Sequence, residues 1–152
     1  MKNRKIRVGI THGDINGVGY EVILKTFSDP TMLELCTPVV YGSPKVAAYH
    51  RKAMEIQTSF SIVNSAEEVQ DGRVNVVNCI EEELKVELTK PTPEAGKAAL
   101  AALERALADY REGLFDVLVT APINKHTIQS DAFHFPGHTE YIEERVGGGQ
   151  KA

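Results

Sequence analysis

Short runs of apolar and β-branched residues alternate along the chain with segments whose apolar positions recur every three or four residues. The short runs predict β-strands, and the longer spacing predicts amphipathic helices. Strands are expected at 6–10, 38–41, 59–63, 74–77, 84–88 and 115–120, longer helices at 18–27, 44–54 and 93–112, and short helical turns near 32–35, 123–124 and 139–145. Such alternation is typical of βαβ units, so we expect a three-layer α/β/α fold around a mostly parallel sheet.

Three segments have patterns that make specific predictions about packing. The helix that begins at Thr92 and Pro93 and ends at Gly113 has a mostly alanine stripe, so it should lie close against a sheet or another helix. Residues 115–120 form an almost continuous apolar strand, of the kind that is usually covered on both faces. Residues 84–88 alternate apolar and charged side chains, which predicts a half-buried strand.

Composition narrows the class of protein. The 152 residues carry a formal net charge of −4, without the basic excess that binding to nucleic acid or an anionic membrane needs. Cys36 and Cys79 lack the spacing of a zinc site or a disulfide framework, so we expect reduced thiols. The apolar stretch after the basic N-terminus is too short for a signal sequence or a membrane span. These features predict a soluble, cytoplasmic protein.

Candidate binding residues follow three predicted strands or turns, at the sheet edge where open α/β folds bind ligands. The first segment is 11–19, where Gly17 and Gly19 permit close backbone approach to a ligand and Asp14 is a candidate contact. Its spacing matches neither a dinucleotide fingerprint nor a P-loop. The alternative is a tight turn in which Asp14 and Asn16 bond the local backbone, with His12 as a surface side chain.

The second and third segments lie near the end of the chain. Asn124 and Lys125 follow the strand at 115–120 and offer amide and ammonium groups to a phosphate or carboxylate, unless they form only a solvated helix start. His138 and Thr139 follow Gly137 at a predicted helix start. His138 can donate to an anionic oxygen or transfer a proton, whereas a local hydrogen bond and a helix cap are the simpler roles. The histidines here do not have metal-site spacing.

Together these segments resemble the N-terminal part of the 4-hydroxythreonine-4-phosphate dehydrogenase family. The matching stretches are Ile-Thr at 10–11, Gly-Asp at 13–14, Gly-Val-Gly at 17–19, Thr-Pro-Glu-Ala-Gly-Lys-Ala-Ala at 92–99, Val-Thr-Ala-Pro-Ile-Asn-Lys at 119–125 and Phe-Pro-Gly-His-Thr-Glu at 135–140. The chain departs from the family at the first turn. Ile15 and Asn16 stand where the family usually has Pro-Ala, Tyr20 stands where it has Pro, and His12 is unusual.

The resemblance implies a fold like that of isocitrate and isopropylmalate dehydrogenases, and a homodimer. It implies NAD-dependent oxidation of the 3-hydroxyl of 4-phosphohydroxy-L-threonine, followed by loss of carbon dioxide to give 3-amino-2-oxopropyl phosphate in pyridoxal phosphate biosynthesis. It also implies a divalent metal (zinc, magnesium or cobalt) that polarises the substrate oxygen. The family's substrate contacts carry over to His138 and Thr139, and the resemblance extends this role to Lys125, Asn124 and Asp14. The resemblance assigns no nicotinamide contact to a residue of this sequence.

Family members are more than twice as long as this chain, and their metal-binding histidines correspond to positions beyond Ala152. Because the chain ends in a glycine run without a closing element, we expect a fragment. Residues 1–137 would form an incomplete first α/β domain, and 138–152 would begin the second. Such a fragment should be inactive alone. Two alternatives remain: a dehydrogenase of a related substrate, such as threonate or erythronate 4-phosphate or a cis-dihydrodiol, or a non-catalytic α/β module.

Overall fold

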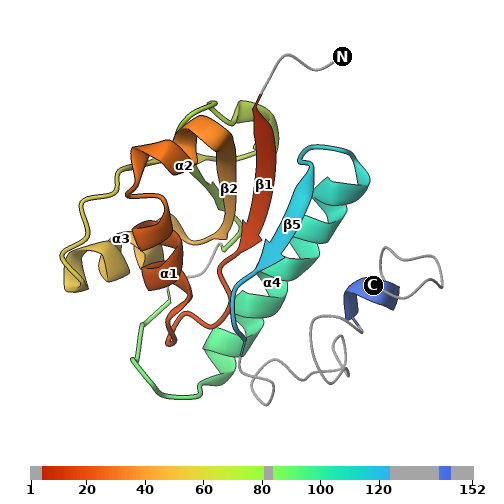
Figure 1. Cartoon of the computed structure of the whole chain (residues 1–152). Helices are drawn as coiled ribbons and strands as arrows, with labels where there is room; N and C mark the ends of the chain where they lie inside the picture. Colours follow the sequence, from red (N-terminus) through yellow and green to blue (C-terminus); the bar gives the residue numbers. More distant parts are fainter. Residues whose placement is uncertain (1–4, 81–83, 124–140, 145–152) are drawn as a thin grey trace.

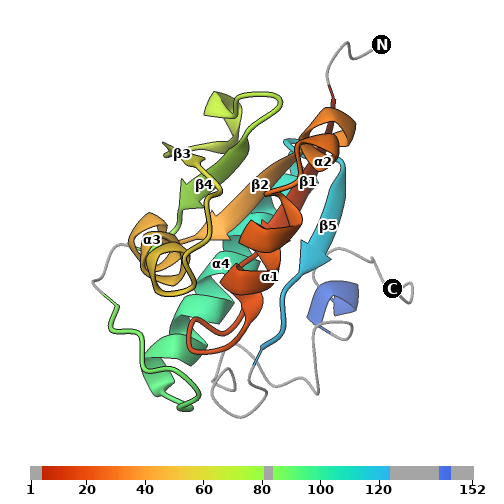
Figure 2. The ribbon, with the colours of Figure 1, turned by 60° about the vertical axis from the view of Figure 1, so that its left-hand side comes forward.

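The computed structural model describes residues 5–80, 84–123 and 141–144. Within these ranges five strands form one sheet in which every pairing is parallel: β1 (Ile6–Thr11), β2 (Cys36–Gly42), β3 (Phe60–Val63), β4 (Val74–Asn78) and β5 (Val117–Thr120). The strand order is β3-β4-β2-β1-β5; Figure 1 labels β2, β1 and β5, and Figure 2 labels all five strands. The helices are α1 (Gly19–Thr26), α2 (Pro30–Leu35), α3 (Pro44–Ala53) and α4 (Pro93–Arg111), with a 3₁₀ turn η1 at Ala66–Glu68. The expected α/β fold is confirmed.

The two longest helices begin where the sequence predicts. The Ser43 side chain accepts a hydrogen bond from the Val46 amide, and the Thr92 side chain accepts one from the Ala95 amide. In both helices proline occupies the first position, where its missing N–H costs no hydrogen bond and its fixed φ suits the helix. These caps fix where α3 and α4 start at the carboxyl edge of the sheet.

Helices cover the sheet on both faces (Figure 2). On one face, Val40 and Val76 pack with side chains of α1 and α3. On the other face, Val39 and Tyr41 pack against Ala102 and Ala106, which belong to the alanine stripe of α4. Small side chains let the helix axis approach the strands closely, so the prediction from the stripe is confirmed.

Two expectations about strands are wrong. Residues 84–88 pair with no strand. The Glu87 amide donates to the Asn16 side chain and the neighbouring Thr89 amide donates to the Asn16 carbonyl, instead of to a sheet ladder. Strand β5 was expected to be covered on both faces, but it is an edge strand of the described sheet and leaves Val117 and Val119 48% and 46% exposed. A continuous apolar run predicts that a strand is covered, but it does not identify the segment that covers it.

Composition predicts reduced thiols and no membrane span. Both cysteines are free, and burial raises the pKa of the Cys79 thiol to about 12, which keeps it protonated at neutral pH. Burial also raises the pKa of Cys36. Among the described residues, no helix combines the length and the apolar character that crossing a bilayer requires.

Candidate functional site

The site is built on the carboxyl edge of the sheet, where β1, β2 and β5 end side by side. Thr11 is paired with Tyr41 of β2 and with Thr120 of β5, so the chain leaves both β1 and β5 at the same edge. The turn that follows β1, residues 12–18, leads directly into α1. In an open parallel sheet this edge is where ligands bind.

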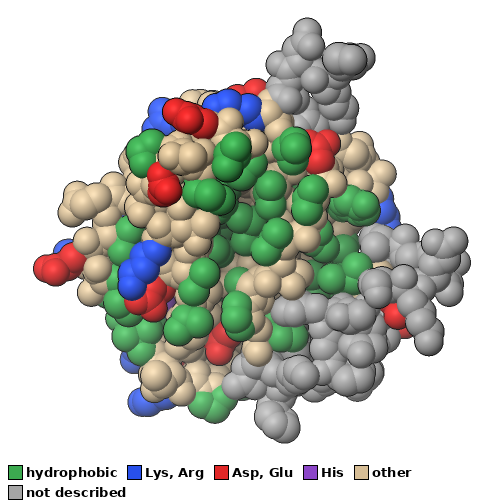
Figure 3. Space-filling model, viewed as in Figure 1, with side chains coloured by type: hydrophobic (Ala, Val, Ile, Leu, Met, Phe, Trp, Pro, Cys, Tyr) green, Lys and Arg blue, Asp and Glu red, His purple; other side chains and the backbone are tan. Residues whose placement is uncertain are grey.

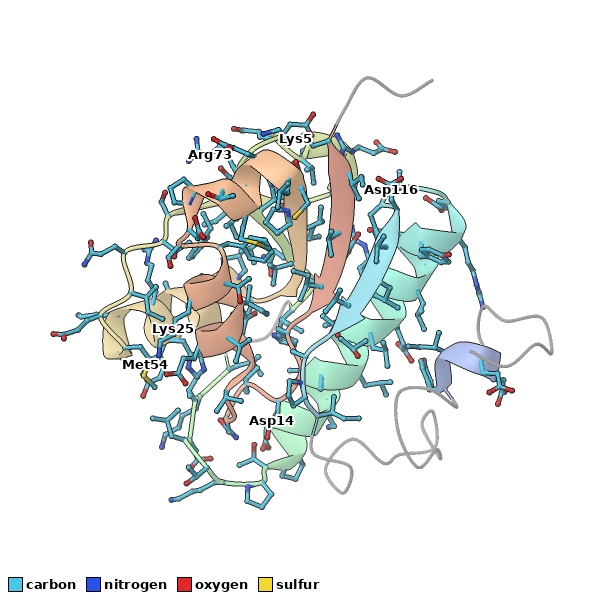
Figure 4. All side chains as sticks on the ribbon, viewed as in Figure 1. Lys5, Asp14, Lys25, Met54, Arg73 and Asp116 are labelled. Atoms are coloured by element: carbon cyan, nitrogen blue, oxygen red, sulfur yellow. The ribbon has the colours of Figure 1, made fainter. Side chains whose placement is uncertain are left out.

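Backbone hydrogen bonds join the first and second predicted segments. The Asp14 N–H donates to the Pro122 carbonyl at 2.9 Å, and the Ala121 N–H donates to the Thr11 carbonyl at 3.1 Å. Gly13 has φ +68°, and a Cβ at this position would collide with the Pro122 carbonyl oxygen. Asp14 therefore lies beside the residues that precede Asn124 and Lys125, next to the start of α4 (Figure 4).

The turn at Asp14 is closed by its own side chain. Oδ1 of Asp14 accepts from the Asn16 N–H at 3.0 Å, and the Asp14 carbonyl accepts from the Gly17 N–H at 3.0 Å. This is the local bonding that the simpler reading of the turn predicts for Asp14. Asp14 is half-buried and lines a groove of about 260 Å³ together with Gly17, Glu21, Leu88, Thr89 and Lys90. The local bond therefore does not remove Asp14 from the surface.

Asn16 binds distant backbone rather than local backbone. Its Nδ2 donates to the Lys90 carbonyl at 2.9 Å and to the Thr92 hydroxyl at 3.2 Å, and its Oδ1 accepts from the Glu87 N–H at 2.8 Å. The expectation of a local bond is therefore correct for the Asn16 N–H and wrong for its side chain. A buried amide with these bonds fastens the segment before α4 to the turn.

His12 is fully buried, so the prediction of a surface side chain is wrong. Its Nδ1 is 2.9 Å from the Tyr20 hydroxyl, and its Nε2 is 2.9 Å from the Ala98 carbonyl of α4. Desolvation lowers the pKa of His12 to about 4, and nearby His50 adds to this, whereas the hydrogen bond to Ala98 opposes it. The ring is therefore neutral at physiological pH.

Sequence reasoning missed the part that Tyr20 and His50 play at this turn. Tyr20 bonds His12, and Nε2 of His50 donates to the Ile15 carbonyl at 2.7 Å. The available signal was that His12, Ile15 and Tyr20 all depart from the family pattern within one short stretch.

Four predicted site residues, Asn124, Lys125, His138 and Thr139, lie outside the described residues. The described residues on either side of them pack in one place. Tyr141 is fully buried with Ala99, Leu103 and Leu107 of α4, and Ile123 packs against the same cluster. Residues 123 and 141 therefore pack on the same hydrophobic cluster of α4. Residues 141–144 are helical, as predicted.

The described residues do not supply a metal site. Among residues 5–80, 84–123 and 141–144, no three His, Cys, Asp or Glu side chains are grouped closely enough to hold an ion. Both buried histidines already use Nε2 in hydrogen bonds to backbone carbonyls. Nδ1 of His50 has no hydrogen-bond partner, but neither His12 nor His50 belongs to such a group among the described residues, so neither fits the metal that the family resemblance implies.

A parallel sheet covered by helices on both faces, with a glycine-containing turn at its carboxyl edge, places the chain among the α/β ligand-binding folds. Comparison with family sequence models is more specific, because residues 34–152 match the model of the pyridoxal phosphate biosynthetic protein PdxA. The chain belongs to this family, and the resemblance drawn from its motifs is confirmed.

Individual relatives agree with this assignment. A 4-hydroxythreonine-4-phosphate dehydrogenase from Bacteroides thetaiotaomicron is 74% identical over all 152 residues, which is 42% of that protein. A relative from Oceanobacillus iheyensis, named as a candidate D-threonate 4-phosphate dehydrogenase, is 32% identical over 93% of the chain and 44% of its own length. The crystal structure of a 4-hydroxythreonine-4-phosphate dehydrogenase from Burkholderia phymatum matches with a TM-score of 0.84 and 28% identity, over 95% of this chain and 44% of that one. The chain thus spans less than half the length of these relatives.

Proposed function

We propose that a full-length protein carrying this chain oxidises the 3-hydroxyl of 4-phosphohydroxy-L-threonine with NAD. Hydride would pass from the carbinol carbon to the nicotinamide and the hydroxyl would lose a proton. The β-keto acid would then release carbon dioxide, and its α-carbon would take up a proton, to give 3-amino-2-oxopropyl phosphate. The observation that carries this proposal is the 74% identity to the Bacteroides dehydrogenase over the whole chain.

We assign substrate contacts to His138, Thr139, Lys125, Asn124 and Asp14. Two observations on the described residues support this group. The Asp14 N–H donates to Pro122, two residues before Asn124. Ile123 and Tyr141, which border the other four residues in the sequence, pack on one cluster of α4. A phosphorylated, zwitterionic substrate needs the mixture of cationic, amide and carboxylate groups that these residues provide.

The test is turnover by the full-length protein with NAD and a divalent metal. The expected result is NADH formation that is faster with 4-phosphohydroxy-L-threonine than with D-threonate or D-erythronate 4-phosphate. Faster turnover of threonate 4-phosphate would replace the proposed substrate with that one, which the Oceanobacillus relative and the unusual Ile15-Asn16 turn favour. Absence of NADH with all three substrates would support a non-catalytic module instead.

His138→Gln is expected to lower kcat/KM at least about tenfold, because a hydrogen bond to a charged group contributes roughly 1.5–3 kcal/mol. Steady-state kinetics on the full-length protein measures this loss. The matched control is His134→Gln, an identical change four residues earlier at a position to which we assign no contact. Equal losses in the two variants would contradict the assignment of His138.

We propose that residues 1–137 are the first part of an α/β domain and that 138–152 begin a second domain. The helices leave the start of β1 and much of β5 exposed, which supports an incomplete domain. Ile6 is 55% exposed, Val117 and Val119 are half-exposed, and hydrophobic side chains gather over these strands and the adjoining helices (Figure 3). In a longer relative such a face is available for the remaining residues to cover. The 152-residue chain alone is therefore expected to form no NADH, and formation of NADH by it would overturn this proposal.

We further propose that the full-length protein is a cytoplasmic homodimer. NAD and the divalent metal would be held largely by residues outside this chain, since the described histidines do not fit a metal site. Dialysis against a chelator should abolish turnover, and adding back zinc, magnesium or cobalt should identify the metal.

A further inference from the structure

We propose that His12 and Tyr20 are positioning residues that clasp the two ends of the Asp14 turn and hold Asp14 at the carboxyl edge of the sheet. His12 is the first residue after β1, and Tyr20 is the second residue of α1. The Tyr20 hydroxyl lies 2.9 Å from Nδ1 of His12, and both side chains are buried. This hydrogen-bonded pair is the clasp. The bond therefore closes the loop of residues 13–19 at its base. The proposal rests on the proposed function only in taking Asp14 as a site residue.

The hydrogen bonds of the clasp have one consistent direction. The Ala98 carbonyl only accepts, so Nε2 of His12 carries the hydrogen and Nδ1 accepts from the Tyr20 hydroxyl. The Tyr20 oxygen in turn accepts from the Ser43 N–H at 2.9 Å. The series thus connects the start of α3, the start of α1, the turn and α4. The Ser43 carbonyl is a second, more distant acceptor for the Tyr20 hydroxyl at 3.4 Å, so the shorter 2.9 Å bond to His12 is the main one.

Packing removes the remaining freedom around the clasp. A Cβ at Gly19 would collide with the His12 carbonyl oxygen, and a Cβ at Gly42 would collide with the Tyr20 hydroxyl and lie 2.6 Å from Nδ1 of His12. The Tyr20 ring also stacks on the His50 ring, with 5.6 Å between centroids. Since His50 bonds the Ile15 carbonyl, the middle of the turn is held from α3 as well.

This arrangement places the clasp on one side of Asp14 and the Pro122 carbonyl on the other. Asp14 is two residues beyond His12, and its own N–H is bonded to Pro122. Release of the Tyr20–His12 bond would loosen one end of the turn while the core strands keep their hydrogen bonds. A positioning role therefore predicts a local effect, whereas a purely structural role predicts a global one.

The test compares Tyr20→Phe with Tyr49→Phe by amide hydrogen exchange on the 152-residue chain and by kinetics on the full-length protein. Tyr49 also contacts the His50 ring, but it is 45% exposed, so the control removes a hydroxyl at the surface beside the same histidine. In the Tyr20→Phe chain the Asn16 and Gly17 amides should exchange at least about tenfold faster relative to β4 amides. In the full-length Tyr20→Phe protein KM should rise about tenfold, with kcat changed less than threefold. Tyr49→Phe should leave both measurements within about twofold.

Equal acceleration of turn and β4 amides, or no change in either, would overturn the clasp. If Tyr20→Phe does not fold, His12→Gln gives the same comparison, since the Gln amide can still donate to Ala98. Nitrogen chemical shifts of unmodified His12 provide a check that needs no variant: a protonated Nδ1 would contradict the proposed direction. If the full-length protein lacks turnover, the proposed function fails while the exchange data still decide the clasp.

Discussion

Gly13→Ala is expected to lower the free energy of unfolding by about 3 kcal/mol, through backbone strain and overpacking together. Gly13 has φ +68°, a conformation that alanine adopts at a cost of roughly 1–2 kcal/mol. The added Cβ would also meet the Pro122 carbonyl oxygen and lie 2.9 Å from the Ala121 carbonyl carbon. Because these neighbours are backbone atoms, the turn must move away from residues 121–122 and weaken the Asp14–Pro122 hydrogen bond.

Gly113→Ala is the matched control for this experiment. Gly113 has φ +74°, and no atom lies within 4 Å of the position of an added Cβ. This variant therefore carries the backbone strain alone and should lose only about 1–2 kcal/mol. Urea unfolding of both variants, followed by circular dichroism, measures the difference. Equal losses would mean that contact between the turn and Pro122 contributes nothing to stability.

Acid is expected to destabilise the fold by about 3 kcal/mol through His12 alone, since each unit of pKa difference corresponds to about 1.36 kcal/mol. Burial lowers the pKa of His12 from 6.5 to about 4, so the unfolded chain takes up a proton more readily than the folded one between these values. The stability that His12 contributes is complete above pH 6.5. It falls as the pH is lowered toward 4, where the folded state also becomes protonated, and changes no further below that.

His12→Gln separates this contribution from that of the carboxylates, which also protonate in acid. Urea unfolding of the unmodified chain and of the variant should be compared at pH 7.5 and 4.5. The variant is expected to be less stable at pH 7.5, because the hydrogen bond between Tyr20 and the His12 ring is lost, and to lose much less stability on acidification. The same loss on acidification in both proteins would show that His12 is not the group responsible.

The sequence predicts the fold well wherever a local signal and the long-range contact agree. Ser43-Pro44 and Thr92-Pro93 predict the helix starts because a cap and its proline act within one turn. The alanine stripe predicts the close approach of α4 because small side chains have the same effect in any sheet. By contrast, residues 84–88 have a strand pattern but bond to Asn16, about 70 positions earlier in the chain. No local pattern specifies that partner.

The candidate site was predicted in part, for a similar reason. The rule that ligands bind at the carboxyl edge of the sheet identified Asp14 and the segment after β5, and the structure places Asp14 beside Pro122. His12 was predicted wrongly, because its burial depends on Ala98, which is 86 positions away, and on Tyr20. A histidine beside a glycine in a turn carries no sign that a helix carbonyl and a tyrosine will enclose it.

The lack of space at Gly42 has a consequence for chimeric proteins made between members of this family. A turn transplanted from a relative with proline in place of Tyr20 would bring no hydroxyl to His12, and would leave a void beside Gly42. Conversely, this turn would not fit a host that has any larger residue where Gly42 stands. Recombination between relatives should therefore succeed only when positions 12, 20 and 42 are inherited as one block.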